Sequence, residues 1–81
     1  MKQELQPYIL PFELALTRWA VVSHSWLEFG GDTPNITAFL AGWGARCLGL
    51  PIPENIPSFP DSFRKGWSEA ECFIVIKNYE N

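Results

Sequence analysis

Residues 33–49 read TPNITAFLAGWGARCLG, and this stretch contains the clearest start and stop signals for a helix in the chain. Thr33 can cap a helix, and Pro34 is of the type favoured at the first helical position. Gly49 ends the pattern. Between these signals lies an apolar stripe with helical spacing, formed by Ile36, Phe39, Leu40, Trp43 and Cys47. We therefore predict a helix over residues 33–48.

A strip of small residues runs beside this stripe. Ala38, Gly42 and Ala45 recur at helical spacing. A glycine inside a helix costs about 1 kcal/mol relative to alanine, so Gly42 needs a structural reason. The strip indicates that another backbone or a bulky ring packs closely there.

A weak internal repeat extends the pattern towards the C-terminus. Residues 39–43 read FLAGW and residues 63–67 read FRKGW, so both have the form Phe-x-x-Gly-Trp. In a helix the Phe and Trp of this motif share one face, and the Gly leaves room beside the rings. We interpret the two motifs as the packing faces of a helix pair.

Two further helices are predicted on either side of residues 33–48. The first covers 11–29, because Pro11 suits a helix start, apolar residues follow at helical spacing, and a Gly-Gly pair ends the pattern. The second covers 60–79 and starts at Pro60. Within it, the apolar run 72–76 fits either a helix or a strand, and we favour a helix because no turn residue precedes it.

The segment between the last two helices is rich in proline. Residues 50–60 read LPIPENIPSFP, and the prolines hold this linker extended. Its apolar Ile52, Ile56 and Phe59 predict that it lies along the helices. The alternative is an exposed recognition segment of the kind that proline-rich grooves bind.

Length and composition support a single domain over residues 1–81. Apolar residues make up 47% of the 81 residues and aromatic residues 15%, which excludes a disordered tail. A chain this short has little room for a deep substrate pocket together with a supporting core. The predicted fold class is all-α: three helices, with the proline-rich linker between the second and the third.

Charge and sequence signals restrict partners and location. The net charge of −3 disfavours nucleic acid, because such binding depends on Lys and Arg contacts to phosphates. We expect no membrane span and no signal peptide, since no long apolar run is present and Pro7 and Pro11 interrupt the N-terminal region. We therefore predict a cytoplasmic protein, with Cys47 and Cys72 as free thiols. The alternative is a disulfide between them, since each lies in a predicted helix and two helices can bring them close.

No residue pattern indicates catalysis, a metal or a cofactor. His24 is the only histidine, and Glu28 four residues later is its expected helix neighbour. His24, Cys47 and Cys72 are too few and too scattered for a structural zinc site. We predict that the protein is no enzyme and binds no cofactor. The alternative is a small enzyme or redox protein that uses Cys47 or Cys72.

The repeat and its surroundings resemble ribosome modulation factor and the small proteins similar to it, over residues 36–71. The family pattern is a helix with an aromatic residue and small residues, a connection with Gly and Pro, and a helix with Gly-Trp and Ala. The matching residues are Phe39, Ala41, Gly42, Ala45, Gly49, Pro51, Gly66, Trp67 and Ala70. The resemblance implies an all-helical fold and binding to the small ribosomal subunit during hibernation.

Taken together, these features favour a non-enzymatic protein–protein interaction module. We expect an inhibitor or adaptor, of the kind that phages and other mobile elements carry, acting on a larger host protein complex. A homo-oligomer is a variant of this prediction, and a ribosome-associated factor that contacts RNA is the alternative. The predicted interface residues are Trp26 and Phe29, whose rings are hard to bury at a helix end, and the basic pair Arg64 and Lys65.

Overall fold

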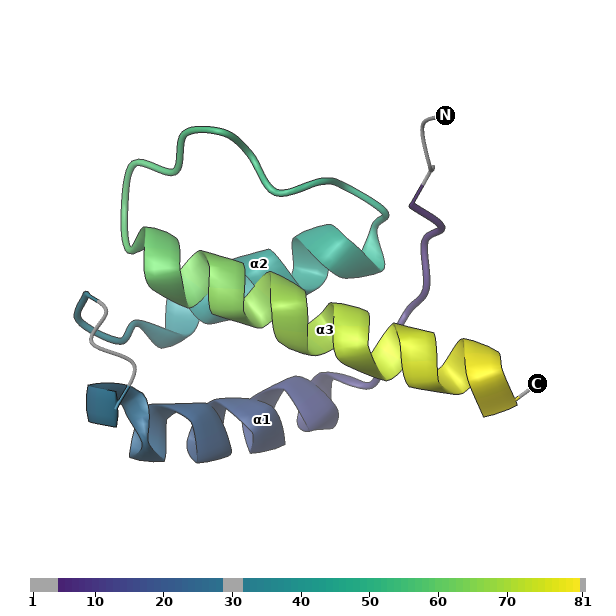
Figure 1. Cartoon of the computed structure of the whole chain (residues 1–81), viewed down its shortest axis with the longest axis horizontal. Helices are drawn as coiled ribbons and strands as arrows, with labels where there is room; N and C mark the ends of the chain where they lie inside the picture. Colours follow the sequence, from purple (N-terminus) through teal and green to yellow (C-terminus); the bar gives the residue numbers. More distant parts are fainter. Residues whose placement is uncertain (1–4, 29–31, 81) are drawn as a thin grey trace.

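The computed structural model describes residues 5–28 and 32–80, and all regular secondary structure within these ranges is helical. The helices, labelled in Figure 1, are α1 (Phe12–His24), α2 (Ile36–Cys47) and α3 (Pro60–Glu80), and a short 3₁₀ turn, η1 (Trp26–Glu28), follows α1. No described residue lies in a strand. The predicted all-α arrangement of three helices is therefore confirmed, and the run 72–76 belongs to α3.

Helices α2 and α3 form the centre of the fold and run in the same general direction (Figure 1). At their starts, Asn35 N donates a hydrogen bond to Ser62 Oγ at 3.0 Å. At the other end of α2, Arg46 Nε lies 2.5 Å from Glu71 Oε1. Because the two helices are parallel, the chain must return along the whole of α2, which is roughly 18 Å for a helix of this length. The extended proline linker spans this distance and places α3 beside α2.

The two Phe-x-x-Gly-Trp motifs meet where α2 crosses α3. A Cβ atom added to Gly42 would lie 1.9 Å from the backbone oxygen of Phe63, and one added to Gly66 would lie 1.9 Å from the backbone oxygen of Phe39. The backbone of each phenylalanine thus packs directly against the glycine of the other motif. The interpretation of both motifs as packing faces of a helix pair is confirmed, and the close neighbour is a backbone.

Aromatic rings connect all three helices across the core. The ring centroid of Trp19 on α1 lies 5.2 Å from that of Phe39 on α2, and Trp43 on α2 lies 6.1 Å from Phe73 on α3. Phe39 and Trp43 are themselves 6.3 Å apart. Rings at such separations pack in tilted arrangements that add to the stabilisation from burial alone. The buried apolar residues of the described chain are Leu10, Ala15, Val22, Trp26, Phe39, Trp43, Cys47, Ala70 and Ile74.

The extended lead before α1 is attached to the end of α2. Tyr8 N donates a hydrogen bond to the Cys47 carbonyl oxygen at 2.8 Å, and Arg46 Nη1 donates to the Gln6 carbonyl oxygen at 3.0 Å. Gly49, with φ 80°, ends α2 and allows this close approach, since a Cβ there would lie 3.0 Å from the Leu5 carbonyl oxygen.

The first helix ends earlier than the predicted residue 29. Helix α1 stops at His24, and Ser25 separates it from the 3₁₀ turn Trp26–Glu28. Ser25 Oγ donates to the Val21 carbonyl oxygen at 3.5 Å, so a side chain competes for the backbone groups of the last turn. Glu28 N then bonds to the Ser25 carbonyl oxygen at 3.0 Å in the tighter i→i+3 pattern.

The predicted start of the second helix was wrong by three residues. Thr33 does not cap α2. Asn35 does, because its side chain accepts a hydrogen bond from Ala38 N at 2.9 Å while its own backbone is extended. The bond from Asn35 N to Ser62 Oγ fixes this residue against α3, which explains why the helix starts here.

This correction predicts a stability difference between two caps. Asn35→Ala should lower the free energy of unfolding by about 1 kcal/mol, since it leaves the Ala38 N–H without its acceptor. Thr33→Ala should change it by less than about 0.5 kcal/mol, as for other exposed residues outside caps. Urea unfolding followed by circular dichroism measures both. A larger loss for Thr33→Ala than for Asn35→Ala would contradict the assignment of the cap.

Candidate interaction surface

An open pocket of about 480 Å³ lies between the proline linker and the N-terminal half of α2. Its walls come from three parts of the chain: the outer face of α2, the second half of the linker, and the first turn of α3. The lining residues are Asn35, Thr37, Ala38, Ala41, Pro53, Asn55, Ile56, Pro57, Ser58, Phe59 and Phe63. Several of them are exposed, so the pocket opens on the surface rather than penetrating the core.

Local sequence explains why this space stays open. Ala38 and Ala41 present only methyl groups on the side of α2 that faces the linker. Prolines 51, 53 and 57 are exposed on the outside of the linker, whereas Ile52 and Ile56 are partly buried beneath it. The prolines fix φ and keep the linker from collapsing onto the alanines. The prediction that the linker lies along the helices agrees with this burial.

Both ends of the linker are attached to α3. Trp67 Nε1 donates a hydrogen bond to the Leu50 carbonyl oxygen at 2.8 Å. At the other end, Phe63 N donates to the Phe59 carbonyl oxygen at 3.1 Å, so Phe59 starts α3. Phe59 has φ 49°, which costs a non-glycine residue about 1–2 kcal/mol. The fold therefore holds a strained aromatic residue, 38% exposed, at the edge of the pocket.

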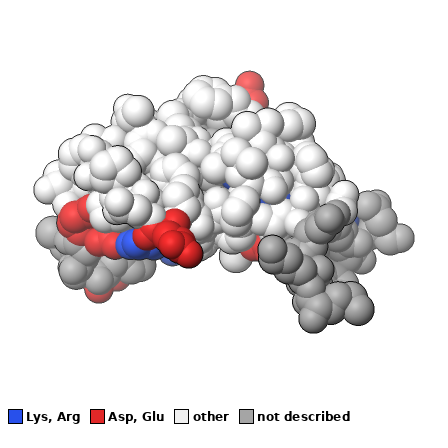
Figure 2. Space-filling model, turned by 90° about the horizontal axis from the view of Figure 1, so that it is seen from above, with Lys and Arg blue, Asp and Glu red and all other residues white. Residues whose placement is uncertain are grey.

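The surface on the side of the pocket bears few charges. Figure 2, seen from the side of the linker, is mostly white: Lys, Arg, Asp and Glu gather chiefly at one edge, and only small red and blue areas interrupt the rest. The sequence gives the reason, because Arg46 and Glu54 are the only charged residues between positions 33 and 59. Arg46 is buried, so Glu54 alone adds a charge to the surface of this segment.

The described residues of the predicted interface differ in burial. Trp26 is only 5% exposed, and its Nε1 donates to the Asp32 carbonyl oxygen at 2.5 Å. The expectation that this ring is hard to bury was therefore wrong: the 3₁₀ turn places it in the core, 6.4 Å from the Trp19 ring. Phe29 lies outside the described residues.

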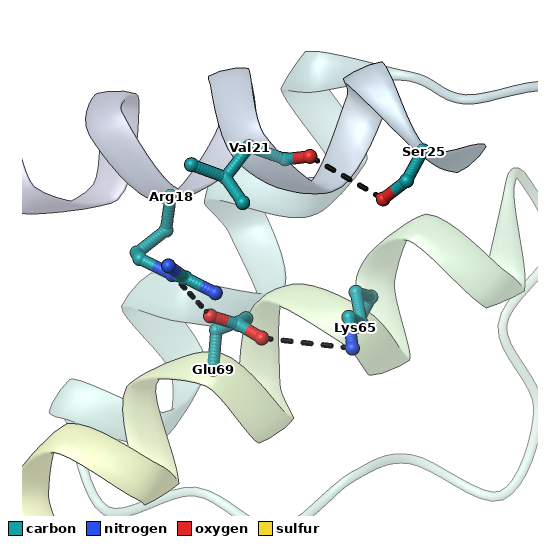
Figure 3. A network of polar contacts seen from close by, with 5 residues as sticks. All are labelled: Arg18, Val21, Ser25, Lys65 and Glu69. Atoms are coloured by element: carbon teal, nitrogen blue, oxygen red, sulfur yellow. Dashed lines mark hydrogen bonds and ion pairs between the residues drawn. The ribbon is translucent and has the colours of Figure 1, made fainter.

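The basic pair Arg64 and Lys65 lies on α3 and takes part in ion pairs. Arg64 Nη1 is 3.6 Å from Asp61 Oδ1, with about half of the Arg64 side chain exposed. Lys65 Nζ is 3.6 Å from Glu69 Oε2, and Glu69 also binds Arg18 of α1 at 2.6 Å (Figure 3). Lys65 therefore contributes to the junction of α1 and α3, and Arg64 is the more accessible of the two.

The pocket was missed because its residues are ordinary when read one at a time. Ala41, Pro57 and Ser58 match no binding motif, and the pocket exists only because the linker folds back over α2. Two signals in the sequence were available. One is the low charge of the segment 33–59, in which only Arg46 and Glu54 are charged, and the other is the set of apolar residues between the prolines.

No group of three or more His, Cys, Asp or Glu side chains could hold a metal ion in the part of the chain that the structure describes. His24 and Cys47 are the last residues of α1 and α2, which end at opposite ends of the molecule (Figure 1). Cys47 is buried and Cys72 is exposed, and both are free thiols.

Comparison of the chain with protein families, curated proteins and solved structures found no match. The resemblance to ribosome modulation factor thus stays a prediction from the sequence. Among the described residues, no helix combines the length and the apolar character needed to cross a membrane.

Proposed function

We propose that this protein is a non-enzymatic interaction module that binds a larger protein through the face formed by α2 and the proline linker. The observation that supports the proposal best is the pocket of about 480 Å³, whose lining contains no charged residue. Depletion of charge around a small apolar recess is typical of the centre of protein–protein interfaces. An inhibitor or adaptor of a host complex, as carried by phages and other mobile elements, would act in this way without any catalytic group.

The alternative, a ribosome-associated factor, has less support from the distribution of basic residues. RNA contact would need Arg46, Arg64, Lys65 and Lys77 to gather on one face, because phosphate contacts supply most of the affinity. Arg46 is 4% exposed and binds Glu71, so it cannot reach a phosphate. Lys65 is paired with Glu69. The alternative therefore depends on the sequence resemblance, and the experiment below includes it as an outcome.

A capture experiment with matched variants tests the proposal. Ala41→Trp places a large ring in the pocket at an exposed position, and Ala20→Trp makes the same change at an exposed position of α1. The tagged wild-type protein and both variants are incubated with bacterial lysate, with and without ribonuclease, and bound proteins are quantified by mass spectrometry. We expect a defined protein that the wild type and Ala20→Trp retain and that Ala41→Trp loses at least tenfold, a loss of about 1.4 kcal/mol.

The other outcomes are equally informative. A partner that binds Ala41→Trp as well as the wild type would show that this face is not the contact surface. Ribosomal proteins that disappear with ribonuclease would favour the ribosome-associated factor instead. Circular dichroism of both tryptophan variants confirms that any loss of binding is not a loss of folding.

A further inference from the structure

We infer that the pocket is an anchor site for one large, uncharged, apolar side chain, of the Trp, Phe or Leu type, which a partner protein presents from an uncharged segment. The inference rests on the proposed function and specifies the chemistry of the partner at its main contact. It follows from the size, lining, stiffness and surroundings of the pocket.

Size and shape favour a side chain of a protein over a free small molecule. A volume of about 480 Å³ can receive a large side chain together with part of the backbone that bears it. Ligand pockets usually bury more than about 70% of a small molecule. Here Thr37, Ala41, Pro53 and Asn55 are exposed along the walls, so a small molecule would keep much of its surface in water. A protein partner covers the rim as well, and this exclusion of water strengthens the central contact.

The lining decides the polarity of the occupant. Ala38, Ala41, Ile56 and the two phenylalanine rings form the apolar walls, and no charged residue lines the pocket. A charged group placed there would lose its hydration without gaining a counter-ion, which is strongly unfavourable. The amide and hydroxyl groups of the lining (Asn35, Thr37, Asn55 and Ser58) suit an indole N–H or the backbone of the incoming segment.

The charges around the pocket indicate that the rest of the partner's segment is uncharged as well. Between positions 33 and 59 the surface bears only the charge of Glu54. The next charges along the chain, Asp61 and Arg64 near the start of α3, are paired with each other at 3.6 Å, so a charged partner segment would find few unpaired groups of opposite charge there. Most of the charged surface visible from this side lies at one edge of the molecule (Figure 2). Electrostatic complementarity therefore favours an uncharged segment around the anchoring side chain.

Stiff walls make the pocket suited to this use before any partner arrives. Proline fixes the backbone of the linker at positions 51, 53 and 57, and hydrogen bonds hold the linker to α3 through Trp67 and Phe63. Phe59 is kept at the rim in the left-handed region, a conformation that a phenylalanine adopts only when the surrounding structure requires it. A wall that is already ordered loses little conformational entropy on binding.

Titration with capped amino acids tests the inference directly. The ¹⁵N-labelled protein is titrated with N-acetyl-tryptophanamide, N-acetyl-phenylalaninamide and N-acetyl-leucinamide, and separately with N-acetyl-argininamide and the capped amide of glutamate. We expect the uncharged apolar probes to shift the amide signals of Ala38, Ala41 and Ile56 with dissociation constants of about 1–10 mM, as for weakly binding fragments. The charged probes should shift these signals at least fivefold less at equal concentration.

The same variants provide the controls. Ala41→Trp should lose the shifts and Ala20→Trp should retain them. Equal shifts with charged and apolar probes, or unchanged binding to Ala41→Trp, would overturn the inference. So would pocket binding of free indole without binding of any capped amino acid, since that pattern defines a small-molecule site.

Failure of the inference can be told apart from failure of the proposed function. If a captured partner depends on Ala41 but no apolar probe enters the pocket, the interaction module stands and the anchor chemistry is wrong. If apolar probes enter the pocket but every captured partner ignores Ala41→Trp, the proposed function is wrong and the inference, which depends on it, is overturned too.

Discussion

Gly42→Ala and Gly66→Ala should each lower the free energy of unfolding by about 3 kcal/mol, and the two together should leave the chain largely unfolded. The added Cβ would meet a backbone oxygen at 1.9 Å in either case, and a helix backbone cannot move aside as a flexible side chain can. The two helices would have to separate, which loosens the packing of Phe39 and its neighbours. Overpacking usually costs about 1–3 kcal/mol and occasionally more, and a clash with a backbone belongs to the upper end, at about 4 kcal/mol. The gain of about 1 kcal/mol in helix propensity offsets part of this cost and leaves the net loss of about 3 kcal/mol.

The chain offers a matched control two residues away. A Cβ added to Gly44 would meet no atom within 4 Å, so Gly44→Ala should raise the free energy of unfolding by about 0.5–1 kcal/mol. Thermal unfolding followed by circular dichroism measures all three variants. For a domain of this size we expect the midpoint to fall by about 12–24 °C for Gly42→Ala and to rise by about 2–8 °C for Gly44→Ala. A Gly42→Ala protein as stable as Gly44→Ala would contradict the close crossing of α2 and α3.

This contrast also shows what the sequence can predict about the fold. The strip of small residues around Gly42 indicated that another element packs closely there, and the Phe-x-x-Gly-Trp repeat indicated a helix pair. Both predictions follow from helical geometry alone. The ends of the helices were harder to predict from the sequence. Asn35 caps α2 rather than Thr33 because Ser62, distant in the sequence, fixes its backbone. A contact between residues so far apart leaves no local signal.

The candidate site was harder to predict for the same reason. Trp26 looked exposed because a helix end beside two glycines offers little cover, but η1 turns towards the core and the Asp32 carbonyl oxygen satisfies the indole N–H. The pocket needs the linker to return along α2, and that return follows from the parallel direction of α2 and α3. Local patterns give the helices and their inner faces, and they do not give the direction in which two helices are packed.

The pair Arg46–Glu71 should respond very differently to the loss of either partner. Glu71→Gln should lower the free energy of unfolding by about 3 kcal/mol, because it leaves a buried guanidinium without its carboxylate. The Arg46 side chain is 5% exposed, and its remaining partners are the Gln6 carbonyl oxygen and the face of Trp67, 5.8 Å from its central carbon. Neither of these neutralises its charge.

Arg46→Met should lower the free energy of unfolding by less, within about 1 kcal/mol, although it removes the more buried residue of the pair. Methionine fills a similar volume without a charge to bury, and replacement of a buried ion by an apolar residue is often close to neutral. The carboxylate left behind is 35% exposed, so water can solvate it. In the Arg46→Met background, Glu71→Gln should then have almost no effect.

A double-mutant cycle in urea, with the exposed pair Arg64–Asp61 as reference, measures this asymmetry. The Arg64 and Asp61 side chains are 49% and 44% exposed, and Arg64→Met should change the free energy of unfolding by less than about 1 kcal/mol, as for other surface pairs. For Arg46 and Glu71 we expect a coupling of about 2–3 kcal/mol. A cost for Glu71→Gln no larger than that for Arg46→Met would mean that the Arg46 guanidinium reaches water. In that case the lead at Gln6 does not cover it, and Arg46 would be available for the phosphate contacts that the ribosome-associated alternative requires.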